Sequence, residues 1–126
     1  MWIYISASAN SLDAFVDPRF GRCPYFIIVN LETMRFEAIP NLASGAMGGA
    51  GIQAAQIIAS RGVKVVITGS IGPNAFQALS AAGIKIITGA SGTVREIVEK
   101  YKRGELKEAS DQAIREYFED GDRQRT

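Results

Sequence analysis

The feature that most constrains the fold is a series of five short apolar runs, each with the length and composition of a β-strand. They are residues 2–7, 25–31, 34–39, 63–67 and 84–87. The second run is apolar almost throughout, which is typical of a strand covered on both faces, whereas the third alternates apolar and polar residues. Because only Glu32 and Thr33 separate these two runs, we expect them to form an antiparallel hairpin.

Three segments carry apolar residues at helical spacing, and each follows one of the later strands. They lie within residues 52–59, 73–82 and 93–101. Gly62 and Gly83 are expected to end the first two helices, and Pro73 suits the first turn of the second. Thr93 and Glu96 have the spacing of a capping box, which predicts the start of the third helix.

The order of elements is therefore β-β-β-α-β-α-β-α, with a hairpin first and βα units afterwards. Right-handed crossovers place helices on both faces of the sheet. We predict an α/β domain with three layers, α/β/α, around a mixed five-stranded sheet of order 3-2-1-4-5. In this sheet the first, fourth and fifth strands are parallel and the second is antiparallel to them.

Length and charge limit the function further. A chain of 126 residues is one ordinary domain, and its formal net charge of +1 argues against a general nucleic-acid binder. No apolar run reaches the ~18 residues that a membrane span requires, and residues 1–10 lack the features of a signal peptide. With a single cysteine, Cys23, no intrachain disulfide can form, so we expect a cytoplasmic protein without a membrane or nucleic-acid partner.

The chain contains no histidine. This excludes Ser-His-Asp and Cys-His catalysis and every histidine metal ligand. A cysteine-rich zinc or iron–sulfur site is excluded within one chain by the single cysteine. The composition therefore favours a binding protein over an enzyme.

The predicted topology brings four loops to one edge of the sheet, at residues 8–24, 41–51, 69–74 and 89–92. Open α/β sheets bind ligands at the carboxyl ends of their parallel strands. Three helices are expected to begin at this edge, where glycines let unpaired backbone amides approach a ligand, and Arg19 and Arg22 add positive charge. An anionic ligand fits these features. The alternative is that the glycines serve only the turns, since neither a dinucleotide-binding fingerprint nor a P-loop is present.

Cys23 lies next to Arg22 and close to Arg19. Neighbouring positive charges lower the pKa of a thiol and would favour a thiolate, which is a soft metal ligand. The alternative is a small buried residue, which is the commoner role of a lone cysteine. Asp13 and Asp17 are interpreted as carboxylates that cap turns in the loop, not as an acid/base pair.

Three motifs resemble the dinitrogenase iron-molybdenum cofactor biosynthesis family. They are FGRCPYF at residues 20–26, GAGIQAA at 49–55 and GSIGPNAF at 69–76. The resemblance covers about residues 1–106 in matching order, and it implies a ribonuclease-H-like α/β/α fold. It also implies an accessory factor that carries the iron-molybdenum cofactor or an iron–sulfur precursor and exchanges it with a cluster donor or acceptor protein.

This chain departs from the family pattern at two positions. Family members often have a histidine before the Phe-Gly pair, where this chain has Arg19. A second histidine often precedes Gly-Ala-Gly, where this chain has Met47 and Gly48. Both departures weaken the case for direct ligation of a cluster, and they leave binding through backbone amides, Arg19, Arg22 and Cys23.

The predicted binding site combines these loops, with Cys23 as the one candidate metal ligand. It comprises Arg19, Phe20, Gly21, Arg22, Cys23, Gly48, Gly49, Gly51, Gly69, Ser70, Gly72, Asn74, Gly89 and Ser91. No catalytic residue is assigned. The ligand is expected to be the iron-molybdenum cofactor, its precursor or another small anion.

The leading hypothesis is a non-enzymatic carrier in which residues 1–104 form the accessory-factor-like domain. Residues 105–126 would form a helical extension, over 105–119, and a frayed tail. The alternative is a protein–protein interaction module that uses this helix or the outer strand at 34–39. A phosphate-directed enzyme ranks last, because few carboxylates lie at the strand ends that would form its site.

Overall fold

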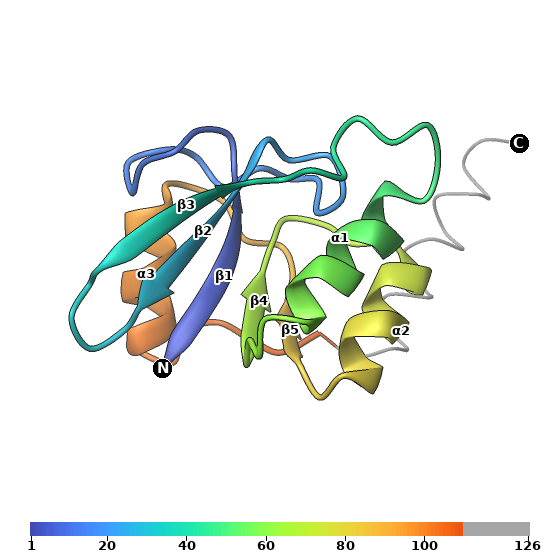
Figure 1. The fold of residues 1–126 in the computed structure, drawn as a ribbon. Helices are drawn as coiled ribbons and strands as arrows, with labels where there is room; N and C mark the ends of the chain where they lie inside the picture. Colours follow the sequence, from blue (N-terminus) through green and yellow to red (C-terminus); the bar gives the residue numbers. More distant parts are fainter. Residues whose placement is uncertain (110–126) are drawn as a thin grey trace, which may run out of the picture.

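The computed structural model describes residues 1–109, which form a five-stranded mixed sheet between helices (Figure 1). The strand order is β3-β2-β1-β4-β5. The strands are β1 (Trp2–Ala7), β2 (Tyr25–Asn30), β3 (Phe36–Pro40), β4 (Val65–Ile67) and β5 (Lys85–Ile87). β2 pairs antiparallel with β1 and β3, whereas β1, β4 and β5 are parallel to one another. The predicted order and strand directions are confirmed.

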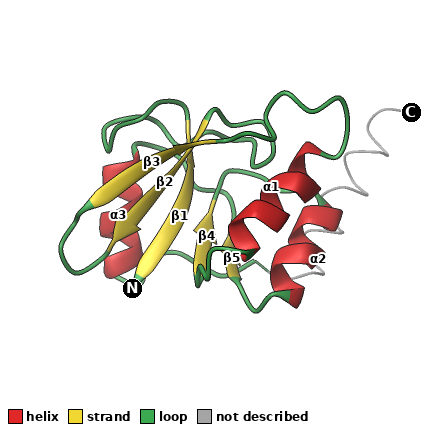
Figure 2. Cartoon of the chain, in the orientation of Figure 1, coloured by secondary structure: helices red, strands yellow, loops and turns green. Residues whose placement is uncertain are grey.

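Within residues 1–109, α-helices cover both faces of this sheet (Figure 2). They are α1 (Ala50–Ala59), α2 (Pro73–Ala81) and α3 (Val94–Lys102). Alternate residues of β1 serve opposite faces, since Tyr4 belongs to the core under α1 and α2, and Ile3 and Ile5 belong to the core under α3. The prediction of three layers is therefore confirmed.

The outer strand β3 begins later than predicted. Its run was expected from Met34, but Met34 has φ 62°, a left-handed conformation that belongs to the hairpin turn and not to a strand. The Met34 N–H donates to the Asn30 carbonyl, which closes the turn at 2.9 Å. Regular pairing with β2 then begins at Phe36, opposite Val29.

The segment after α3 also differs from its prediction. A helix was expected from Glu105, but residues 105–109 are not helical. Glu108 instead forms an antiparallel bridge with Ile87, and the Ala109 N–H donates to the Ile86 carbonyl at 2.7 Å. The chain thus continues along the outer edge of β5, because that edge offers unpaired backbone groups. The rest of the predicted helix, and the predicted tail, lie outside the described residues.

Among residues 1–109, no helix combines the length and the apolar character needed to cross a membrane.

Candidate anion-binding site

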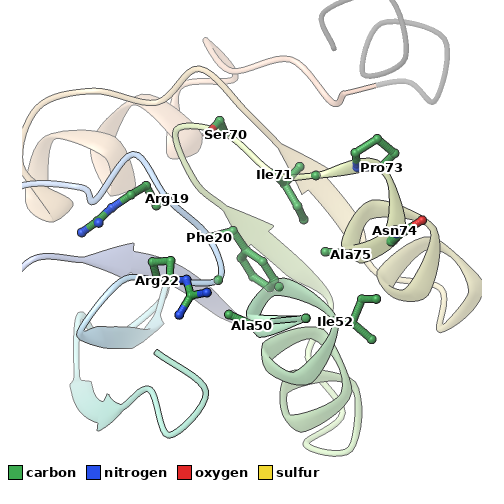
Figure 3. Close-up of a pocket in the computed structure, with 14 residues that line it drawn as sticks. Arg19, Phe20, Arg22, Ala50, Ile52, Ser70, Ile71, Pro73, Asn74 and Ala75 are labelled. Carbon is green, nitrogen blue, oxygen red and sulfur yellow. The ribbon is translucent and has the colours of Figure 1, made fainter. Parts of the chain in front are cut away.

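A pocket opens at the predicted edge of the sheet, between the loop before β2, the start of α1 and the β4–α2 connection. Its cavity volume is about 390 Å³. Figure 3 shows Phe20, Ile52 and Ile71 pointing toward the same space from these three segments. The lining consists of Arg19, Phe20, Gly21, Arg22, Gly49, Ala50, Gly51, Ile52, Ser70, Ile71, Gly72, Pro73, Asn74 and Ala75. Among residues 1–109, this lining includes two cationic side chains and no carboxylate.

Backbone hydrogen bonds fix the first loop beside the end of β4. The Ser70 N–H donates to the Pro18 carbonyl at 2.7 Å, and the Phe20 N–H donates to the Ser70 carbonyl at 3.2 Å. Arg19 and Ser70 form a parallel bridge, so this loop extends the sheet by one short pairing. The arginines are consequently carried on a segment that is held by ladder-type hydrogen bonds.

Two glycines permit the close approach of these segments. A Cβ atom at Gly21 would lie 2.5 Å from the Gly51 nitrogen, and a Cβ atom at Gly69 would lie 2.5 Å from the Pro18 Cα. Each of these neighbours is backbone, which cannot move aside as a flexible side chain can. Gly69 does not line the pocket, and its lack of a side chain admits the Pro18 backbone, a role that the sequence did not distinguish from ligand contact.

Both helices at the pocket begin without a side-chain cap. The N-cap residues are Gly49 of α1, with φ 68°, and Gly72 of α2, and neither first turn contains an acidic residue. The first backbone N–H groups of a helix have no intrahelical acceptor and carry partial positive charge. In α1 the first intrahelical bond is donated by Gln53, so the N–H groups of residues 50–52 precede it.

The start of α3 is different, and the pocket does not extend to it. The Thr93 hydroxyl accepts a hydrogen bond from the Glu96 N–H at 3.2 Å, as the capping-box spacing predicted. The loop before it covers the same helix start, since the Val94 N–H donates to the Ala14 carbonyl at 2.9 Å. The first amides of this helix therefore have acceptors, and neither Gly89 nor Ser91 lines the pocket.

The two arginines are both held by acceptors within the protein. The Arg19 Nε lies 3.4 Å from Oδ1 of Asp17, a buried carboxylate, and Figure 3 shows the Arg19 side chain extending away from Ile71. The Arg22 Nη1 donates to the carbonyls of Ser44, at 3.0 Å, and Ala46. Arg19 is 64% exposed, so its charge remains accessible at the rim of the pocket.

Cys23 does not line the pocket, and the lowered pKa expected for its thiol is wrong, whereas the alternative of a small buried residue agrees with its burial. The side chain is fully buried, with the thiol donating to the Phe20 carbonyl at 3.3 Å and the Asn41 amide 3.7 Å away. Burial, followed by the nearby Asp17 carboxylate, raises the pKa of the thiol from 9.0 to about 12. The expected lowering by the arginines does not occur, because burial disfavours the thiolate and neither arginine is among the groups that shift this pKa.

This raised pKa predicts a pH-dependent stability. Between pH 9.0 and about 12 the unfolded chain has lost the thiol proton and the folded chain keeps it. The contribution of Cys23 is thus complete below pH 9.0, and each further pH unit lowers the free energy of unfolding by about 1.4 kcal/mol. Urea denaturation at about pH 8 and about pH 10 measures how much the free energy of unfolding falls as the pH rises. This fall should be smaller in Cys23→Ala than in wild type by about 1.4 kcal/mol. Equal pH dependence in both proteins would contradict the assignment.

The pocket thus unites nine of the predicted residues and leaves out five. Those left out are Cys23, Gly48, Gly69, Gly89 and Ser91. Sequence reasoning missed Ala50, Ile52, Ile71, Pro73 and Ala75. Most of these occupy the first turns of α1 and α2, so the predicted helix starts were the signal that could have found them. Within residues 1–109, Cys, Asp and Glu side chains form no group of three that could hold a metal ion.

The model of one protein family, described as dinitrogenase iron-molybdenum cofactor, matches residues 1–104. The chain belongs to this family. The match spans every strand and helix described above, and it includes all three segments that form the pocket. The family assignment made from the three motifs is therefore confirmed.

Relatives of known structure share this fold. The apo form of the orange protein from Desulfovibrio gigas is 42% identical, with a TM-score of 0.83 over 86% of this chain and 92% of that chain. A NifB-like protein from Thermotoga is 34% identical, with a TM-score of 0.73 over 85% of this chain and 91% of that chain. In sequence, an uncharacterised protein of Methanocaldococcus jannaschii is also similar, with 33% identity over 72% of this chain and 80% of its own length.

Proposed function

We propose that this protein is a non-enzymatic carrier that holds an anionic metal cluster in the pocket between α1 and α2. The family relates the chain to the iron-molybdenum cofactor of dinitrogenase. The observation that carries the proposal is a pocket lined by two uncapped helix starts and two arginines, with no carboxylate among the described residues of its lining. Such a site attracts negative charge through backbone amides and guanidinium groups and needs no metal–protein bond.

The composition of the lining favours a large, soft anion over a small hydrated one. Phe20, Ile52, Ile71 and Pro73 give the pocket apolar walls beside its polar groups. A strongly hydrated oxyanion loses its water against such walls, at a cost in free energy. A sulfide-rich cluster spreads its charge over many polarisable atoms, so the same walls suit the iron-molybdenum cofactor or an iron–sulfur precursor.

Two further facts support a carrier. The solved relative from Desulfovibrio gigas is described as an apo form, and this description implies that the orange protein also has a ligand-bound form. No histidine occurs in this chain and Cys23 is buried, so a held cluster would keep its own coordination sphere and could be released intact. A donor and an acceptor protein for the cluster are implied by this role.

Anaerobic incubation of the protein with isolated iron-molybdenum cofactor, followed by gel filtration, tests the proposal. We expect iron and molybdenum to co-elute with the protein, and we expect the retained metal to fall as the salt concentration rises, because arginine contacts are screened. Molybdate serves as the hydrated comparison and should bind more weakly. Absence of metal in the protein fractions at low salt would refute a carrier of this cluster.

The alternative of a partner-docking module retains one structural argument. β3 is an edge strand, and the Phe36 side chain at its start is 43% exposed. Against it, Pro40 ends the strand without an N–H group and Glu37 lies within it, both of which disfavour addition of another strand. We therefore place the carrier function first.

A further inference from the structure

Arg22 contacts two parts of the molecule at once. It lines the pocket, and its Nη1 donates to the carbonyls of Ser44 and Ala46 in the loop that leads into α1. The base of this loop is anchored separately, because the buried Asn41 side chain donates to the carbonyls of Gly21, at 3.1 Å, and Cys23, at 2.9 Å. Ala43 is also buried in the core, so the loop is anchored as far as residue 43, whereas the residues at 44–48 are half-buried or exposed.

The position of residues 44–48 depends on hydrogen bonds from Arg22. Among the hydrogen bonds of the described part of the chain, Arg22 provides the only ones that join this segment to residues outside the 41–49 loop. The other bonds are local, from Ser44 N–H to the Asn41 carbonyl and from Ala46 N–H to the Ala43 carbonyl. Met47 in this segment is fully exposed.

We propose that Arg22 couples occupancy of the pocket to the position of residues 44–48. This inference rests on the proposed function. A guanidinium group bonds more strongly to a full negative charge than to neutral carbonyl oxygens. An anion in the pocket therefore draws the Arg22 side chain away from Ser44 and Ala46. The segment then loses the hydrogen bonds that join it to residues outside the 41–49 loop. The surface around Met47 then differs between loaded and unloaded protein, which gives a donor or acceptor protein a means of telling them apart.

Coupling of this kind is reciprocal, since whatever frees Arg22 from the loop also prepares it for the anion. Arg19 provides the matched comparison. It lines the same pocket and carries the same charge, but its partner is Asp17 and not the loop. Substitution of either arginine removes one positive charge from the site, whereas only substitution of Arg22 removes the connection to residues 44–48.

Pulsed hydrogen exchange with mass spectrometry on the full chain tests the coupling. We expect the Ser44 and Ala46 amides, which donate the local hydrogen bonds of this segment, to exchange several-fold faster when wild-type protein is saturated with isolated iron-molybdenum cofactor. Arg22→Gln should show the fast exchange without the cofactor and no further change with it, and unloaded Arg19→Gln should exchange as slowly as wild type. Unchanged exchange in unloaded Arg22→Gln, or slower exchange in loaded wild type, would overturn the coupling while leaving the carrier function standing. Failure of wild type to retain the cofactor in gel filtration would instead overturn the carrier function, and the coupling with it.

Discussion

Gly21→Ala is expected to destabilise the protein by about 2 kcal/mol and to abolish anion binding at the pocket. The added methyl group would lie 2.5 Å from the Gly51 nitrogen and 2.7 Å from its Cα atom. Because both neighbours are backbone atoms at the start of α1, the loop that carries Arg19 and Arg22 must move away from the helix. Urea denaturation measures the first effect, and cofactor retention in gel filtration measures the second.

Gly45→Ala is the matched control for this substitution. No atom lies within 4 Å of a Cβ at Gly45, and its backbone does not have a positive φ. The same chemical change in a neighbouring loop should therefore leave the free energy of unfolding within about 0.5 kcal/mol of wild type. Equal destabilisation by the two substitutions would contradict the role given to close backbone contact at Gly21.

Asn74→Asp is expected to weaken binding of the iron-molybdenum cofactor by about tenfold or more while leaving stability unchanged or slightly raised. Asn74 is an exposed residue in the first turn of α2 that lines the pocket. A carboxylate in the first turn stabilises a helix by roughly 0.3–1 kcal/mol, because it satisfies the partial positive charge there. The same carboxylate repels an anion in the pocket, and a tenfold loss of affinity corresponds to about 1.4 kcal/mol.

The opposite signs of these two effects make the experiment decisive. Most substitutions that disturb a site lower both ligand affinity and stability, whereas here the affinity should fall and the stability should not. Asn74→Gln, which keeps the amide and adds no charge, should bind within about threefold of wild type. If Asn74→Asp binds the cofactor as tightly as Asn74→Gln does, either the negative charge assigned to the ligand or its assigned position in the pocket is wrong.

Sequence determined the architecture of this protein because the features that specify it are local. A hairpin followed by βα units is predicted by three features of the sequence. They are the alternating run before Pro40, the short turn at Glu32 and the apolar runs that become β4 and β5. Chain direction then follows from the right-handed crossover rule, which requires no side-chain contact. The three motifs also fixed the family, since each lies in one continuous stretch of chain.

The sequence could predict only part of the site. It brought Arg19, Arg22 and the glycines before α1 and α2 to one edge, since loops that follow parallel strands meet there. It could not tell a glycine that faces a ligand from one that admits a neighbouring backbone, as Gly69 admits Pro18. That distinction depends on which segment lies opposite, and the segment is distant in the chain.

Only the tertiary structure decided the solvent exposure of each polar group and its hydrogen-bond partners. Cys23 is near two arginines in sequence, yet it is buried in the core, so desolvation raises its pKa where sequence proximity predicted a lowering. The start of α3 shares the edge with α1 and α2, yet Thr93 and the Ala14 carbonyl satisfy its amides. Pattern and spacing are properties of neighbours along the chain, whereas solvation and hydrogen-bond satisfaction are set by neighbours in space.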